Sequence, residues 1–435
     1  MSGEDLFGLW LSTTPEAAAA YNAGLRRILL VQSGAESHLQ TAVRTDPGFA
    51  LGHAALALLG HEYGAPVDVQ AALAAATRAA ARRGTDRERS QVAAVAAHVR
   101  GGGPRDAIQR HLRTHPRDAL MLGVAVPTIA FAGVTDVPEE AWALVEELAP
   151  AYGDDWWYAG MLAFVRQEQQ RWDEAAALAD RALAAEPASG HAVHARTHVH
   201  YETADHGAGL AWLDGWIARR GPHAHHGAHF SWHAALHELA LEDADAVRRR
   251  YYGQLAPPRV TGMRALVDSA SLLWRAALAD QWDGEPPIDA VLDAVDPAVL
   301  TRPRTPFAAW HAAVALAVAG DAAALARLGR YARTGPTEVF STVVAPLVAG
   351  FQAYVERRYD AAAALLLSVR PALGALGGSA AQREVIEDTL LDALVAAGRL
   401  ADARALLVHR LDRRPSRRDL RRVFELPRYW QPQPV

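Results

Sequence analysis

Apolar residues recur along most of the chain at spacings of three and four positions, which is the period of a helix with one buried face. No alternation of apolar and polar residues, the pattern of a strand, extends over a useful length. The clearest helical unit runs from Trp172 to Pro187, where the proline ends the second helix of a pair. Ala163, Ala175 and Ala182 are small enough to let the two helices approach closely. This pattern is typical of a tetratricopeptide repeat.

The same register recurs elsewhere in the chain. Its two clearest further copies are Ala35, Ala42 and Pro47, and Ala403, Leu407 and Pro415. Thr14 and Pro15 form a helix start, with threonine as the cap and proline in the first helical position. No linker rich in Pro, Gly or Ser separates two domains. The sequence therefore predicts an all-α fold, a tetratricopeptide-like solenoid of helix pairs (an α/α superhelix), as one domain over residues 1–435.

The composition removes several kinds of chemistry. The chain has no cysteine, which excludes disulfides, thiolate nucleophiles and cysteine-ligated zinc or iron–sulfur sites. It also has no lysine, because all 44 residues in the Lys+Arg total are arginine. Schiff-base enzymes and P-loop ATPases both need that amine and are excluded as well. Histidine, carboxylates, arginine, tyrosine and serine remain available.

The formal net charge of −5 argues against nucleic-acid and membrane partners. No signal-peptide pattern or uninterrupted apolar span is evident, so we expect a cytoplasmic protein. The arginine run 413–418 is expected to lie on a solvated terminal helix. The loop histidines His223, His225 and His226 are also expected to be solvated.

Histidines gather between residues 191 and 237 in two stripes of helical spacing. The first stripe is His191, His194, His198 and Glu202. The second, on a later helix, is His229, His233 and His237, with Trp232 beside it. A helix and a return loop separate them, so we expect the two stripes to face each other across one cavity. On the next apolar helix, Asp268 and Arg275 lie two turns apart, with Ser271 near the aspartate.

This arrangement suggests a pocket for a small molecule. Imidazoles exchange protons near neutral pH, and a carboxylate can fix the tautomer of one of them. We expect His198 and His233 to exchange protons and Asp268 to orient one of them, in a metal-free hydrolysis, elimination, isomerisation or cyclisation. The expected substrate contacts are His194, His229, Trp232, Glu202, Ser271, Arg275 and His311.

Other interpretations remain open. The histidines can serve only as hydrogen-bonding groups of a helix contact. A zinc site is also compatible with His194 and His198 at positions i and i+4, although the segment lacks the glutamate of the HExxH motif. The alternative function is a scaffold that binds a protein or peptide on the concave face of the array.

Several short segments together resemble a known family. They are Arg87-Glu88 with 92–95, His115-Pro116 with Asp118, 160–168 with Trp172-Asp173, Val193-His194 with 198–200, His229 with Trp232-His233 and Ala235-Leu236, 267–269 with Ser271 and Arg275, and 377–379 with 381–383. In this order and spacing the chain resembles the tetratricopeptide repeat protein 38 family over nearly its whole length. The resemblance implies a tetratricopeptide-like α-solenoid and little about activity.

The chain departs from that family at three places. Tyr201 stands where the family has glutamate after the equivalent of His200, and Val126-Pro127 stands where the family tends to have a His-Asp pair. Ala309 replaces an acidic residue that precedes His311. If the family residues form a catalytic set, this chain has lost part of it or performs different chemistry.

Overall fold

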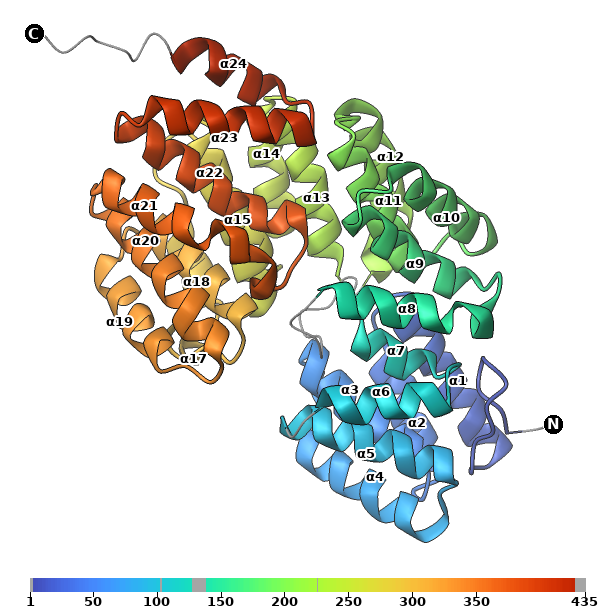
Figure 1. Ribbon diagram of the computed structural model, residues 1–435. Helices are drawn as coiled ribbons and strands as arrows, with labels where there is room; N and C mark the ends of the chain where they lie inside the picture. Colours follow the sequence, from blue (N-terminus) through green and yellow to red (C-terminus); the bar gives the residue numbers. More distant parts are fainter. Residues whose placement is uncertain (1–2, 102–103, 127–137, 225, 427–435) are drawn as a thin grey trace, which may run out of the picture. The chain divides into compact units, whose positions relative to one another are not determined.

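The computed structural model describes residues 3–101, 104–126, 138–224 and 226–426, and every regular element in these ranges is a helix (Figure 1). The all-α fold of helix pairs predicted from the sequence is therefore confirmed. Pro127 and His225, which entered the sequence argument, lie outside the described ranges. By their internal contacts the residues form two compact units, Met1–Arg196 with Pro222–His226, and Thr197–Gly221 with Gly227–Val435. A single folding domain over 1–435 stays a prediction.

The first unit contains α1 (Pro15–Leu29), α2 (Ala35–Thr45), α3 (Ala50–Tyr63), α4 (Val69–Arg83), α5 (Asp86–Arg100), α6 (Pro104–Thr114), α7 (Ala119–Ala125), α8 (Pro138–Tyr152), α9 (Trp156–Glu168), α10 (Trp172–Ala185), η1 (Gly221–His223) and the start of α11 (Gly190–Glu202). Neighbours pack as pairs: α1 with α2, α3 with α4, α5 with α6, and α9 with α10. Ala163, Ala175 and Ala182 are fully buried, as the repeat pattern predicts. Thr14 caps α1 by accepting a hydrogen bond from the backbone N–H of Ala17.

The second unit contains the end of α11, then α12 (His206–Arg220), α13 (Gly227–Ala240), α14 (Ala244–Arg250), η2 (Tyr251–Leu255), η3 (Ala265–Ala270), α15 (Ser271–Leu278), α16 (Ile288–Asp293), α17 (Pro297–Thr301), α18 (Pro306–Val318), α19 (Ala322–Arg333), η4 (Phe340–Val344), α20 (Ala345–Val355), α21 (Tyr359–Val369), η5 (Arg370–Leu376), α22 (Ala380–Ala396), α23 (Leu400–Arg413) and α24 (Arg417–Glu425). Three short segments, η2, η3 and η4, are π-helical. Because a π turn closes with i→i+5 bonds, it moves the following side chains to another face than an α-helix would.

The second unit is also joined by contacts between residues far apart in the chain. α15 packs against α18 and α22, and α18 packs against η3. Tyr201 at the end of α11 donates a hydrogen bond of 2.8 Å to Glu384 on α22, which is 183 positions later. The unit is therefore more than a stack of sequence neighbours.

One 18-residue stretch, Tyr359–Leu376, is long and apolar enough to cross a membrane by length and composition. It consists of α21 and η5, with Arg370 and Pro371 where one becomes the other. Since core helices pass the same test, this is weak evidence for a membrane span.

Two expectations about solvated segments are wrong in part. Arg414, in the arginine run 413–418, is buried because it pairs with Glu202 and Glu384. His226 is also buried, whereas His223 is exposed as expected.

The glycines of α12 provide a test of the close packing. A Cβ atom on Gly209 would lie 2.7 Å from Cβ of His200 and 2.9 Å from Cε1 of His237, whereas one on Gly207 would meet nothing within 4 Å. We expect Gly209→Ala to lower the free energy of unfolding by about 1–3 kcal/mol through overpacking. We expect Gly207→Ala to raise it by up to about 1 kcal/mol through helix propensity. Urea unfolding of both variants measures the difference, and equal effects would contradict the packing.

Candidate functional site

His198 of the first stripe meets His229 and His233 of the second stripe within the second unit. His198 lies on α11, and His229 and His233 lie one turn apart on α13. The ring centroids of His198 and His233 are 4.6 Å apart, and those of His229 and His233 are 4.7 Å apart. All three side chains are buried. The sequence argument therefore correctly paired these two helix faces.

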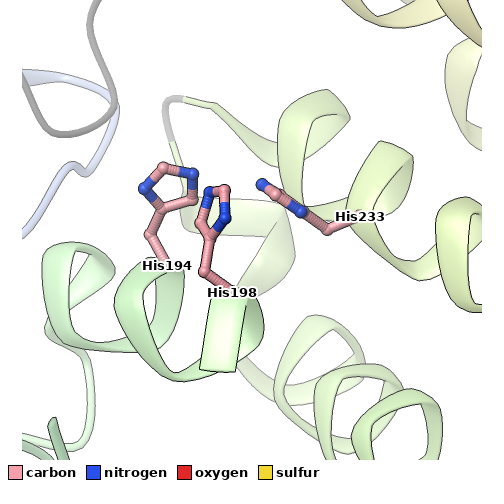
Figure 2. A group of neighbouring side chains, drawn as sticks. All are labelled: His194, His198 and His233. Carbon is pink, nitrogen blue, oxygen red and sulfur yellow. The ribbon is translucent and has the colours of Figure 1, made fainter. Parts of the chain in front are cut away.

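His194 precedes His198 by one turn on α11. One ring nitrogen each from His194, His198 and His233 lies within 4.8 Å of the others, and Figure 2 shows the rings turned toward a common point. Three imidazoles at this spacing match the donor set of a His₃ metal site. The interpretation as a metal site thus has the necessary ligand types, all of them buried.

Asp268 lies in the π-helical segment η3 and is fully buried. Its Oδ1 is 2.8 Å from Nδ1 of His229, and its Oδ2 is 3.5 Å from Nη1 of Arg264. The carboxylate accepts the Nδ1–H of His229 and so fixes the tautomer of that ring. From the sequence we expected Asp268 to orient His198 or His233, but its bonded partner is His229.

Other polar groups buried around this cluster have atoms without a hydrogen-bond partner. They are both ring nitrogens of His311, Oγ of Ser271 and Nε1 of Trp232. The ring of Trp232 stacks on that of His229 at a centroid distance of 5.3 Å, and the ring of His311 stacks on that of Trp310 at 3.4 Å. Because buried polar atoms are normally hydrogen-bonded, these three side chains are the places where water or a ligand would be held.

Burial controls the protonation of the cluster. It lowers the pKa of His198 to about 3, with a smaller contribution from the charge of His229. Burial likewise lowers the pKa of His311 well below its usual value, assisted by His229 and Arg275. The pKa of His229 is lowered by burial, and Asp268 opposes that shift. Since an imidazole with a pKa near 3 is a weak base at pH 7, His198 remains neutral there.

The remaining predicted contacts, Arg275 and Glu202, belong to a separate ionic cluster. Arg275 donates to the backbone oxygens of Ala381 and Gln382 and lies 3.5 Å from Asp388. Glu202 lies 3.0 Å from Nη1 of Arg414. The guanidinium of Arg275 is also 5.9 Å from the ring of Trp232, so this residue adjoins the histidine cluster.

This ionic cluster was missed in the sequence argument. Glu384 and Asp388 on α22 are buried against Arg410 of α23 and Arg414, which directly follows that helix. Although burial opposes ionisation, the arginines lower the pKa of Glu384 well below its usual value. The cluster borders a cavity of about 50 Å³. The sequence offered one signal for this cluster: the acids Glu384 and Asp388 are four positions apart, and so are the arginines Arg410 and Arg414 in the next helical segment.

A larger hollow lies in the first unit, between α4 and α5. This groove has a volume of about 550 Å³ and is lined by Thr77, Ala80, Ala81, Arg89, Val92, Ala93, Ala96, Ala97 and Arg100. Five of these nine residues are alanine, and Arg89 and Arg100 lie three turns apart on α5. Volumes of this order are usual for ligand sites.

The His229–Asp268 pair can be tested by substitution. We expect Asp268→Ala to lower the free energy of unfolding by about 3–5 kcal/mol, because it leaves His229 and Arg264 without their buried carboxylate. Asp289→Ala, at an exposed position of the same unit, should change it by less than about 0.5 kcal/mol. Urea denaturation measures both free energies. An Asp268→Ala variant as stable as wild type would contradict the buried His229–Asp268 pair.

His237 supplies a pH test. Burial lowers its pKa to about 3, assisted by the charges of His206, His200, Arg414 and Arg250. In the unfolded chain the pKa of His237 is near 6.5, so at pH 5 its imidazole binds a proton that it does not bind in the folded chain. Stability therefore falls as the pH drops from about 6.5 toward 3, by about 2 kcal/mol at pH 5 for this one residue.

Urea unfolding at pH 7 and pH 5 measures this loss. His237→Gln should remove about 2 kcal/mol of the difference between the two pH values. His409→Gln, at an exposed position, should leave the difference unchanged. An unaltered difference in His237→Gln would show that His237 is not the group responsible.

Comparison with known proteins adds little to this description. No protein-family model matches the chain. The crystal structure of yeast Tom70 aligns over 95% of this chain and 95% of its own, with 12% sequence identity and a TM-score of 0.34. A score this low does not establish a shared fold, so the fold assignment depends on the helix pairs themselves.

Proposed function

We propose that this protein is a non-catalytic, tetratricopeptide-like scaffold that binds a helical segment of a partner protein in the groove between α4 and α5. The proposal depends on one observation, the open 550 Å³ groove of the first unit. Helical-repeat proteins commonly bind partners on their extended surfaces, and an amphipathic helix can lay its apolar face into a groove. The earlier resemblance to the tetratricopeptide repeat protein 38 family is part of this proposal.

The lining of the groove indicates the kind of partner. Ala81 and Ala93 are exposed, and their side chains end at Cβ, so larger apolar side chains of a partner can enter between the helices. An amphipathic helix presents such side chains at positions i, i+4 and i+7.

The charges of the groove favour acidic residues in the same segment. Arg89 and Arg100 are both exposed on α5, and Arg89 already forms an ion pair with Asp86. Arg100 is therefore the stronger attraction for a partner carboxylate. We infer an amphipathic helix with leucine-sized anchors and flanking glutamate or aspartate.

A second candidate function is acid–base transformation of a small molecule at the histidine cluster. The hydrogen bond between His229 and Asp268 favours it, because this is the arrangement of a base and its orienting carboxylate. The low pKa of His198 weighs against proton transfer through that ring at neutral pH. A thermal-shift screen against metabolites tests this candidate, since a ligand of the cluster would raise the melting temperature.

Binding of a synthetic peptide tests the groove. The probe is a short amphipathic helix with leucine at i, i+4 and i+7 and flanking glutamates, followed by fluorescence anisotropy. We expect Ala93→Trp to abolish binding by filling the groove, and Arg100→Glu to weaken it about tenfold, the equivalent of about 1.4 kcal/mol. Binding to wild type should weaken as salt is added.

Matched variants in the same helix pair control for unrelated effects. Ala71→Trp and Arg78→Glu alter exposed positions of α4 that do not line the groove, and both should bind the peptide as wild type does. Binding that survives Ala93→Trp, or a wild-type chain that binds no such peptide, would refute the proposed function.

A further inference from the structure

A second group of possible metal ligands lies within the first unit, on helices outside the histidine stripes. His61 and Glu62 lie in the last turn of α3, and His98 lies on α5. One donor atom from each lies within 4.8 Å of the other two. Two imidazoles and one carboxylate are a ligand set that zinc sites use.

Glu62 is the centre of this group. Its side chain is 7% exposed, and its Oε1 is hydrogen-bonded to Nε2 of His98 and lies 3.8 Å from Nε2 of His61. A buried carboxylate requires a cation or hydrogen-bond donors, and here the nearby groups are imidazoles. Imidazoles bind metals in their neutral form, so a divalent ion can supply the positive charge that balances the carboxylate.

The distances suit a small ion after a modest adjustment. Zinc binds nitrogen and oxygen at about 2.0–2.2 Å, which places neighbouring ligand atoms of a tetrahedral site about 3.3 Å apart. The 3.8 Å between His61 and Glu62 is close to this value. The hydrogen bond between His98 and Glu62 would open as the ion takes the place of the shared proton, which is released to solvent.

Access from solvent distinguishes this group from the one in Figure 2. The side chain of His61 is 30% exposed, so an ion can enter beside it and keep water as a further ligand. His194, His198 and His233 are all buried and include no carboxylate. A divalent charge is therefore better compensated at Glu62.

We propose that His61, Glu62 and His98 form a zinc-class divalent metal site with an open coordination position for water. The site is separate from the groove: His98 on α5 is buried and bonded to Glu62 of α3, whereas the groove lies between α5 and α4. Metal binding and peptide binding can therefore fail independently.

Calorimetric titration of the full chain, stripped with EDTA, tests the site with Zn²⁺ as the probe. We expect His61→Ala and Glu62→Gln each to weaken the zinc affinity by more than about 100-fold, beyond the usual effect of losing an outer-shell contact. Co²⁺ bound in place of zinc should give visible d–d absorption that both variants lose. His409→Ala, at an exposed position of the second unit, should bind as wild type does.

The far-ultraviolet circular dichroism of each variant is compared with that of wild type, to exclude loss of zinc binding through unfolding. His61→Ala is the most informative variant, because the side chain of His61 is partly exposed and its removal should disturb the fold least. Zinc should also raise the melting temperature of wild type but not that of His61→Ala. The proposal is overturned if wild type binds no zinc or if both variants retain the affinity. It is also overturned if only His198→Ala or His233→Ala removes binding, since the ion then belongs to the group in Figure 2.

Discussion

The second unit depends on one buried ionic cluster, in which Glu384 and Asp388 of α22 are matched by arginines from α15 and α23. Glu384 accepts hydrogen bonds from Tyr201, 2.8 Å away, and from Arg414, while Asp388 lies 2.9 Å from Arg410. Charges removed from water are tolerated only when each has its partner, and losing one partner typically costs about 3–5 kcal/mol. The cluster therefore joins the end of α11 to α15, α22 and α23.

The histidine cluster illustrates how burial changes the chemistry of a residue. A free imidazole titrates near neutral pH, but desolvation lowers the pKa of His198 to about 3. Asp268 counters this effect for His229, to which it is bonded. The cluster thus contains one imidazole that burial keeps neutral, His198, and one that a carboxylate orients, His229. Buried polar atoms of His311, Ser271 and Trp232 near this cluster have no hydrogen-bond partner, and they are the observation that favours a ligand-binding role.

In the first unit, α5 takes part in two different surfaces. Its alanines and Arg100 border the groove with α4, while His98 is buried and bonded to Glu62 of α3. A helix that is packed on several sides can present an apolar groove on one side and metal-ligating groups on another, because neighbouring residues point about 100° apart around the axis. Small side chains make this possible, since they leave room between helices without breaking the close packing of the pair.

Local pattern was sufficient to predict the helices, the alanines of the repeat at Ala163, Ala175 and Ala182, and the cap at Thr14, because these depend on residues a few positions apart. It also predicted that the histidines of α11 and α13 would meet, since spacings of three and four place them on single faces. Only the tertiary structure decided their partners. The π turn of η3 and the packing of α13 bring Asp268 to His229, and the joining of α11 to α22 and α23 buries Arg414. Glu62 and His98 meet across 36 positions for the same reason: helix packing, not sequence spacing, determines which faces come into contact.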